Sequence, residues 1–226
     1  MGGHNDLSAS TGRDARRARA LTSQGCSSCP PADKLLGELV RDPTLVAFSR
    51  NVDYWDAIGW KDTLADPKNS ARQRAYARLR GDRGVYTPQI VVNGTAHVVG
   101  SNKAAIDQAL ASAPRLSVPV NLSVENGKLR VNVPAANGAG EVWVYALAKN
   151  VSVAIGRGEN GGRTVTYHNV ARRWQKLGDY RGQAANWNVP LEQLNIGGAD
   201  TAAVLVQGGN ADEPGVMLGA AIASLR

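Results

Sequence analysis

The sequence predicts an α/β domain followed by a β-rich domain similar to a small antiparallel sandwich. Amphipathic helices alternate with short strands up to about residue 115, which is typical of a mixed α/β unit. Beyond residue 116, nearly every periodic segment repeats every two residues, as strands do. In addition, both cysteines stand in one C-x-x-C motif ahead of the first helix. We therefore divide the chain into segments 1–19, 20–115 and 116–226.

The first segment, 1–19, is polar and rich in Gly, Ser and Arg, and it has neither helical nor strand periodicity. It is predicted to be a disordered leader, a tag remnant or a displaced start. The segment lacks the apolar core of a signal peptide. No window of the chain approaches the roughly 18 consecutive apolar residues that a membrane span needs, so no span is expected.

The composition is that of an ordinary globular protein. Apolar residues make up 43% and charged residues 20%, so a sizeable core can form. The net charge of +7 is interpreted mainly as an aid to solubility, and no nucleic-acid partner is expected. Two cysteines are too few for a disulfide framework, so their role is expected to be local.

The stretch TSQGCSSCPPAD, residues 22–33, places both cysteines at the start of a helix. The helix dipole and free N–H groups there stabilise a thiolate, so Cys26 is predicted to be the nucleophile. Cys29 lies one turn further on, where it can attack a mixed disulfide. Because a residue before proline disfavours helical angles, we expect the helix to start near Pro31. A pair of buried thiols or a structural disulfide is the alternative.

A metal site is the other use of such a pair. Zinc would need two more ligands, and the histidines, His4, His97 and His168, are not at zinc-finger spacing. Cu(I) needs only two thiolates and an imidazole, and His97 lies in the same predicted domain as Cys26 and Cys29. A copper site of these three residues therefore stays open, although a strand histidine is more often part of a packed or solvated sheet.

Two helices and a strand follow the cysteines. Apolar residues at helical spacing predict a helix at 32–40, which Pro43 ends. Segment 45–52 alternates as a strand does, although Arg50 falls on its apolar face. A second helix is predicted at 71–80, after side chains that can cap it.

The aromatic loop DYWDAIGWKD, residues 53–62, lies between that strand and the second helix. Its side chains are expected near the ends of the strands, where they can form a substrate wall or carry a proton. Aromatic packing with solvated acids is the alternative. The candidate substrate-binding residues are Asp53, Tyr54, Trp55 and Trp60.

A β-hairpin and a helix complete the first domain. Strands at 89–92 and 97–99 are predicted around an Asn-Gly turn, and a helix follows at 101–112.

In the second domain, an Asn-Gly hairpin is predicted at 118–133 and a strand at 142–147. Further strands flank the glycine-rich turn 157–162, which lacks the ending of a phosphate loop and opens no helix. The last two strands are predicted at 201–207 and 215–225.

The order of these elements resembles the thioredoxin fold over residues 20–113. In that fold, a proline with a cis peptide bond begins the strand that faces the two cysteines. The resemblance assigns this place to Pro88, with Thr87 before it. The alternative is an ordinary trans proline at the first residue of a strand.

The motifs TSQGCSSCPPAD, VDYWDAIGWKD, ARQRAYA, VYTPQIVVNG and RGENGGRTVTYHNV resemble those of the DUF1223 family. The resemblance implies a thioredoxin-like domain with a β-rich extension, a periplasmic or secreted location, and an uncharacterised activity. No signal peptide is visible in this chain, so a cytoplasmic location stays open. Relatives carry an apolar strand before the cysteines, whereas Arg16, Arg17 and Arg19 are expected to fit a buried central strand poorly.

The function predicted from these features is that of a thiol–disulfide oxidoreductase. Cys26 attacks a substrate disulfide, Cys29 resolves the intermediate, and Thr87 and Pro88 hold the substrate backbone. The expected partners are protein or small-molecule thiols and disulfides, with no cofactor and no specified oligomeric state. Two other classes stay open: a Cu(I)-carrying thiol module and a non-catalytic interaction protein that binds through its β-rich domain.

Overall fold

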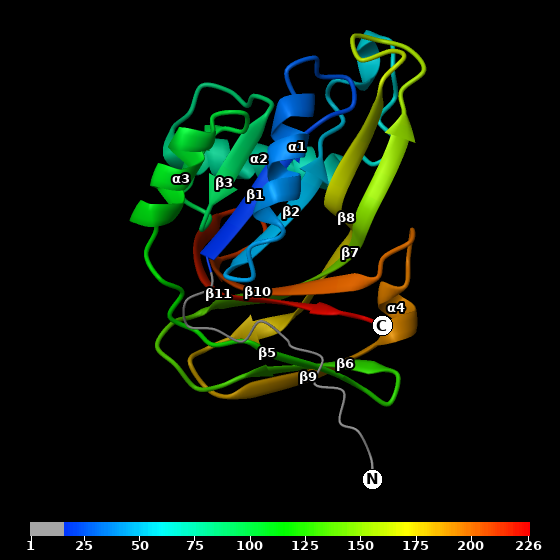
Figure 1. The fold of residues 1–226 in the computed structure, drawn as a ribbon. Helices are drawn as coiled ribbons and strands as arrows, with labels where there is room; N and C mark the ends of the chain where they lie inside the picture. The colour runs from blue at the N-terminus through cyan, green and yellow to red at the C-terminus, as the bar shows by residue number, and fades with distance from the viewer. Residues whose placement is uncertain (1–15) are drawn as a thin grey trace.

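A mixed sheet of eight strands carries both halves of the chain in the computed structural model, which describes residues 16–226 (Figure 1). Parallel pairing occurs between β1 and β2 and between β2 and β8, and the other neighbours are antiparallel. In sheet order, the strands are β11 (Pro214–Ser224), β10 (Thr201–Gly209), β7 (Gly140–Ala154), β8 (Thr164–Tyr180), β2 (Leu45–Asn51), β1 (Arg16–Thr22), β3 (Gln89–Val92) and β4 (Ala96–Val99).

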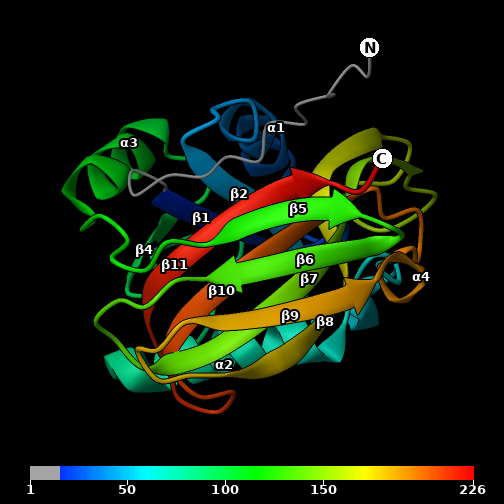
Figure 2. The ribbon, with the colours of Figure 1, turned by 90° about the horizontal axis from the view of Figure 1, so that it is seen from below.

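A second, three-stranded antiparallel sheet has the order β5 (Asn121–Glu125), β6 (Lys128–Val133) and β9 (Ala185–Pro190). These strands lie across β7, β10 and β11 of the large sheet (Figure 2). The two layers share an apolar core because alternate residues of each strand point between them, as Leu129 and Val131 of β6 and Val142 and Val144 of β7 do. The sequence predicts a separate antiparallel sandwich here. The structure has one small antiparallel sheet, and the layer that it covers belongs to the mixed sheet shared with the first half of the chain.

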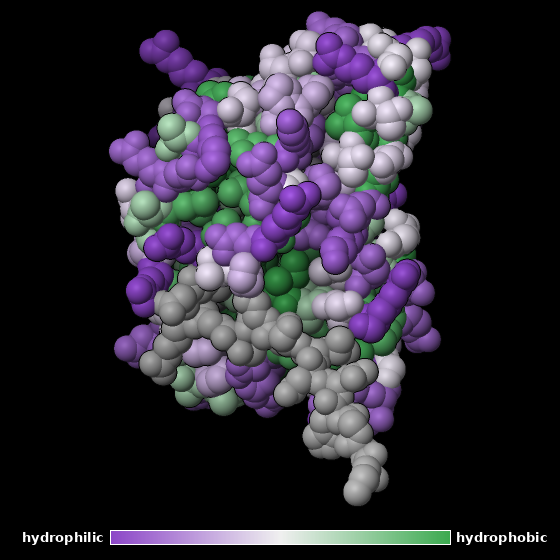
Figure 3. All heavy atoms as spheres, viewed as in Figure 1, coloured by the Kyte–Doolittle hydropathy of each residue, from purple (hydrophilic) through white to green (hydrophobic). Residues whose placement is uncertain are grey.

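Helices cover both faces of the other end of the large sheet. α1 (Pro30–Leu39) and α3 (Lys103–Ser112) pack on one face of β1 and β3, where Leu36 and Ile106 meet Ala20 of β1. α2 (Pro67–Arg80) packs on the opposite face (Figure 1). Polar side chains cover much of the surface over α1 and α3, as expected of helices whose apolar sides face the sheet (Figure 3). The two remaining helical segments are the 3-10 turn η1 (Asp56–Ile58) and the short α4 (Leu191–Leu194).

β1 differs from the sequence prediction. It starts at Arg16, so residues 16–19, which were expected in the leader, belong to a central strand. Arg17 and Arg19 are 1% and 2% exposed, so this central strand buries arginines, which the sequence predicts to fit there poorly. Because side chains alternate along a strand, both point away from α1, towards Phe48 and the α2 side. Residues 1–15 of the predicted leader lie outside the described residues.

Most other elements lie where the sequence places them, with shifted ends. α1 begins at Pro30, one residue before the expected start. α2 begins at Pro67 instead of residue 71, because the Asp66 side chain accepts a hydrogen bond from the Lys68 N–H and caps the helix earlier. β7 merges two predicted strands into one of 15 residues, and β8 runs beyond its predicted end to Tyr180.

The two halves of the chain meet where β2 pairs with β8. Ser49 and Val170 are paired, and the Asn169 side chain donates a hydrogen bond of 2.9 Å to the carbonyl of Ala47. β7 and β8 extend beyond this point, which carries their connecting loop to the same end of the molecule as the start of α1 (Figure 1). Among the described residues, no helix is long and apolar enough to cross a membrane.

Candidate functional site

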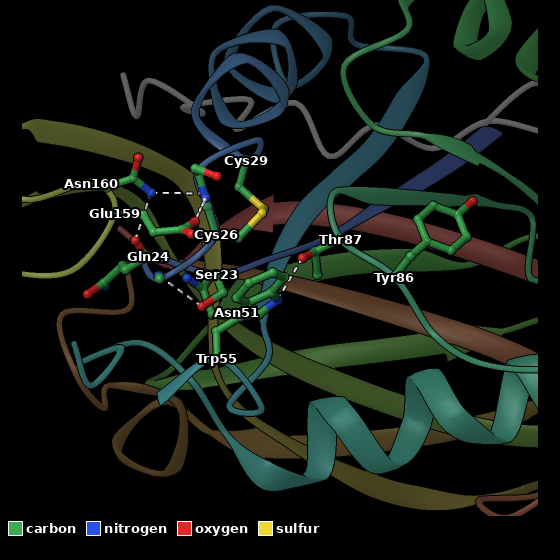
Figure 4. Close-up of a disulfide and its surroundings, with 12 residues drawn as sticks. Ser23, Gln24, Cys26, Cys29, Asn51, Trp55, Tyr86, Thr87, Glu159 and Asn160 are labelled. Atoms are coloured by element: carbon green, nitrogen blue, oxygen red, sulfur yellow. Dashed lines mark hydrogen bonds between the residues drawn. A yellow bond between two sulfur atoms is a disulfide. The ribbon is translucent and has the colours of Figure 1, made fainter. Parts of the chain in front are cut away.

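Cys26 and Cys29 form a disulfide at the junction of β1 and α1 (Figure 4). Cys29 is the N-cap residue of α1, and its carbonyl accepts hydrogen bonds from the N–H groups of Ala32 and Asp33. The two prolines after it fit the first helical turn, where a missing N–H costs no intrahelical bond. Both cysteines are buried, with 1% of Cys26 and 0% of Cys29 exposed.

The Thr87–Pro88 peptide bond is cis, as the resemblance predicted. A Cβ atom built on Gly100 would lie 3.1 Å from Cβ of Pro88 and 3.2 Å from Cβ of Ala32, so the proline lies close to the first turn of α1. The hydroxyl of Thr87 accepts a hydrogen bond of 2.8 Å from the indole N–H of Trp55. The structure therefore brings Trp55, Thr87 and the two cysteines together (Figure 4).

Trp60 also contacts the cysteine loop. Its indole N–H donates a hydrogen bond of 2.8 Å to the side-chain oxygen of Gln24, two residues before Cys26. Asp62 accepts from the Gln24 backbone N–H at 2.8 Å and from the Asn51 side chain at 2.9 Å. Burial raises the pKa of Asp62, although these hydrogen bonds oppose the shift. Through Gln24, the aromatic loop holds the cysteine loop in position.

Asp53 and Tyr54 bind to α2. Asp53 accepts a short hydrogen bond from the Ser70 hydroxyl, and the Tyr54 hydroxyl donates to the side-chain oxygen of Gln73 at 3.2 Å. These contacts anchor the aromatic loop to the helix. Whether Asp53, Tyr54, Trp55 and Trp60 contact a substrate stays a prediction.

The loop between β7 and β8 completes the site from the second half of the chain. The side-chain amide of Asn160 donates hydrogen bonds of 2.9 Å to the carbonyls of Gln24 and Cys26, and Glu159 accepts from the Ser27 N–H at 3.2 Å (Figure 4). Asn160 is itself buried. No sequence signal links this residue to the cysteines, because 134 positions separate it from Cys26.

Glycines allow this loop to approach closely. A Cβ on Gly156 would lie 3.2 Å from the Trp60 ring, and one on Gly158 would lie 3.2 Å from Cβ of Trp60. Gly158 also has a φ of +76°, which favours glycine. The glycine-rich turn is therefore a packing element against the cysteine site.

Asp33 is a second residue that the sequence interpretation missed. It follows Cys29 by four positions, so the two share one face of α1. It is buried, and neither carboxylate oxygen has a hydrogen-bond partner. Burial raises the pKa of Asp33 well above its usual range, and Asp62 adds to this, whereas the nearby Thr22 hydroxyl lowers it. The signal was an acidic residue on the apolar face that also carries Leu36.

The two described histidines, His97 and His168, do not join the cysteines, and His4 lies outside the described residues. Nδ1 of His97 lies 2.8 Å from the hydroxyl of Tyr86, and Nδ1 of His168 lies 2.8 Å from the side-chain oxygen of Asn150. Between residues 16 and 226, no group of three or more His, Cys, Asp or Glu side chains is placed to hold a metal ion. The structure thus does not assemble the copper site that the sequence left open from Cys26, Cys29 and His97.

Fold and site define a class of protein: a mixed α/β sheet with a small antiparallel sheet, carrying a C-x-x-C disulfide beside a cis-proline. The chain belongs to the DUF1223 family, described as proteins of unknown function, whose model matches residues 21–207. That match includes the cysteine loop, the aromatic loop and the β7–β8 loop.

Two solved structures are similar to this chain. The crystal structure of protein AGR_C_4864 from Agrobacterium tumefaciens is 31% identical, with a TM-score of 0.83, and the match covers 93% of this chain and 94% of that one. The structure of HBP35 of Porphyromonas gingivalis is 12% identical, with a TM-score of 0.59 over 94% of this chain and 75% of that one. The second likeness concerns the fold alone. A comparison with curated proteins gave no match.

Proposed function

We propose that the protein is a thiol–disulfide oxidoreductase built on a thioredoxin-like α/β unit. The observation that carries the proposal is a C-x-x-C disulfide at the first turn of a helix, next to a cis-proline. Helix N–H groups stabilise a thiolate at this position. Thr87 and Pro88, directly before β3, are proposed to hold the substrate backbone beside the sulfurs. Protein or small-molecule disulfides and thiols are the proposed substrates.

In the reductive direction, the thiolate of Cys26 attacks one sulfur of the substrate disulfide. A bond forms between Cys26 and that sulfur, and the other substrate sulfur leaves as a thiolate. The thiolate of Cys29 then attacks Cys26, which forms the Cys26–Cys29 disulfide and releases the second substrate thiolate. Two electrons pass from the protein to the substrate, and the two cysteine protons end on the released thiols. The oxidative direction is the reverse.

Asp33 is the proposed proton carrier for Cys29. Its buried carboxyl lies one helical turn from Cys29, and in its ionised form it can take the thiol proton as the second attack begins, because burial raises its pKa and makes the carboxylate a stronger base. A carboxyl with an ordinary low pKa would accept that proton less well at neutral pH.

The burial of both sulfurs adds a requirement. A substrate sulfur must approach Cys26 in line with the bond that breaks, and Cys26 is 1% exposed. We infer that exchange needs a displacement of the segments that flank the disulfide. The β7–β8 loop is the segment best placed to move, because only a few hydrogen bonds from Glu159 and Asn160 join it to the cysteine loop.

The test is a redox titration of the full chain in glutathione buffers, with alkylation and mass spectrometry to count free thiols. We expect a reversible Cys26–Cys29 couple and catalysis of insulin reduction that Cys26→Ser abolishes. Cys29→Ser is the matched variant: it should accumulate a mixed disulfide through Cys26. A pair that neither reduces nor reforms at physiological potentials would contradict the proposal.

A non-catalytic interaction protein is the second candidate, and the same burial favours it. In this case, the disulfide stabilises the loop between β1 and α1 and does not turn over. Cys26→Ser would then leave partner binding unchanged and lower the melting temperature instead.

A further inference from the structure

Four arginines are buried between the large sheet and α2, on the side opposite α1. Arg17 and Arg19 come from β1, Arg50 from β2 and Arg72 from α2, and they are 1%, 2%, 1% and 3% exposed. We call them the arginine cluster. Three of them, Arg17, Arg19 and Arg50, lie on strand faces that the sequence pattern predicts to be apolar.

Strand register explains why they meet. Arg17 and Arg19 are two residues apart on β1, so both point to the same face. β1 and β2 are parallel, with Arg19 opposite Phe48 and Leu21 opposite Arg50, which puts Arg50 on that face as well. Arg72 approaches from α2, where it and Arg19 both bind the side-chain oxygen of Gln207, at 2.8 and 3.0 Å.

The partners of the cluster are uncharged. Arg17 donates to the sulfur of Met217, Arg50 donates to the side-chain oxygen of Asn69, and Arg72 also donates to two backbone carbonyls. In the part of the chain that the structure describes, none of the four arginines forms a salt bridge with an acidic side chain.

Aromatic rings supply further contacts to the guanidinium groups. Arg17 lies 4.7 Å from the ring centre of Phe48, and Arg50 lies 4.6 Å from that of Trp174. Arg19 and Arg72 are both 5.4 Å from the centre of the Tyr76 ring. Such contacts lower the cost of burying a cation, but they do not neutralise its charge.

Each of the four guanidinium groups also keeps at least one buried nitrogen without a hydrogen-bond partner. Buried charges in proteins are normally paired, and buried N–H donors are normally satisfied, because both lose their hydration on folding. Five such atoms in one cluster therefore call for an acceptor with negative charge. They are Nε and Nη2 of Arg17, Nη1 of Arg19, Nη2 of Arg50 and Nε of Arg72.

The pKa shifts of the buried groups agree with a strongly positive interior. Burial lowers the pKa of Arg17 well below its usual value, and neighbouring Arg19 lowers it further. The pKa of Arg50 falls to about 10, again mainly through burial. Burial opposes ionisation of Tyr76, yet Arg19 and Arg72 bring its pKa down to about 7. The positive charge of the arginines thus favours a negative charge within the arginine cluster.

We propose that the arginine cluster binds a small monovalent anion of the halide class inside the folded protein. Guanidinium is weakly hydrated and suits an anion that sheds its water at moderate cost, which favours a halide over a multiply charged oxyanion. The cluster is enclosed, so the anion is a structural component of the core and not a surface counterion. This site is independent of the cysteine chemistry.

The first experiment measures melting temperature while sodium chloride replaces sodium gluconate at constant ionic strength. Gluconate is too large to enter an enclosed site. We expect the melting temperature to rise by about 5 °C over a roughly 50-fold increase in chloride. In crystals grown with sodium bromide, an anomalous peak should lie within hydrogen-bond distance of at least two cluster arginines.

Two variants separate a specific site from a general salt effect. Arg17→Met removes two unpartnered N–H groups and puts an apolar chain beside Phe48 and Met217. It should lose most of the chloride response and melt in gluconate at or above the wild-type temperature. Arg78→Met, on the exposed side of α2, should show the same rise in melting temperature with chloride as the wild type.

The proposal would be overturned if the wild type has the same melting temperature in chloride and in gluconate and the bromide-grown crystals show no anomalous peak at the cluster. So would a chloride response that Arg17→Met retains in full, because a general salt effect acts on both proteins alike. If Arg17→Met does not fold, the two wild-type measurements decide the question by themselves.

Discussion

Asp33 is a buried carboxyl without a hydrogen-bond partner, whereas this side-chain type is mostly exposed or paired. Its folded-state pKa is raised by burial, so the folded protein favours the protonated carboxyl. The contribution of Asp33 to stability is fully present below the unfolded-state pKa, about 3.9, and is lost as the pH rises through the raised folded value.

We therefore predict that Asp33→Asn melts at a higher temperature than the wild type at pH 8, and that the difference shrinks towards pH 4. Thermal melts of the oxidised proteins across this range provide the measurement. Asp212→Asn, in an exposed loop, is the control and should follow the wild type. A constant difference at all pH values would show that folding does not shift the pKa of Asp33.

Tyr76 gives a second prediction at this scale. It faces Arg19 and Arg72, with Arg17 next to them, and these three cations lower its pKa to about 7 against the effect of burial. Absorbance at 295 nm in gluconate should show one tyrosine ionising near pH 7, and Tyr76→Phe should remove that step. Because the folded pKa is depressed, stability should increase as pH rises from about 7 to 10.

Chloride acts on the same charges. If an anion occupies the arginine cluster, it competes with the tyrosinate, so chloride should move the ionisation of Tyr76 to higher pH. The same titration repeated in sodium chloride measures this shift. A pKa that is identical in both salts would count against the anion site.

At the level of elements, the β7–β8 loop and the start of α1 act together. Asn160→Ala removes two hydrogen bonds and leaves the carbonyls of Gln24 and Cys26 without this donor. A buried acceptor without a partner costs about 1–3 kcal/mol, so we expect a loss of stability of that order. We also expect faster reduction of the disulfide by dithiothreitol, because the loop no longer holds the cysteine segment.

The matched control for that experiment is Glu159→Gln, since Glu159 is exposed and its amide replacement can still accept from Ser27. Its reduction rate should stay close to that of the wild type. If Asn160→Ala loses stability without any change in the reduction rate, the loop is a structural support and does not control access to the cysteines.

At the scale of the whole molecule, the core crosses the predicted domain boundary. Val46 and Phe48 of β2 pack in one cluster with Trp143 and Tyr145 of β7. β2 also pairs directly with β8. A fragment that ends at residue 115 would expose the apolar face of β2 to water.

We therefore predict a single cooperative unfolding transition for the full chain by calorimetry, and no native-like folding of fragment 1–115. Near-ultraviolet circular dichroism of the fragment is the second measurement. Two separate transitions, or a folded fragment, would support a division into two independent domains at residue 115.

Local patterns in the sequence were sufficient for the helices around the cysteines, the hairpin that follows Pro88, and the strand-rich second half. Capping residues, proline positions and Asn-Gly turns act over a few residues, so they can be interpreted without knowing the fold. The cis bond at Pro88 followed from the resemblance to the thioredoxin fold instead, and the structure bears it out.

Which segments meet depends on pairing between distant strands, which leaves no local pattern in the sequence. The contact of Asn160 with Cys26 and the gathering of Arg17, Arg19 and Arg50 under α2 exist only because β2 pairs with both β1 and β8. Taken singly, each arginine contradicts the rule that strand faces towards a core are apolar. The sequence thus determined the local elements and the place of the cysteine pair before the first helix. Only the tertiary structure decided which side chains those elements bury together, because burial and charge pairing are set by neighbours far apart in the chain.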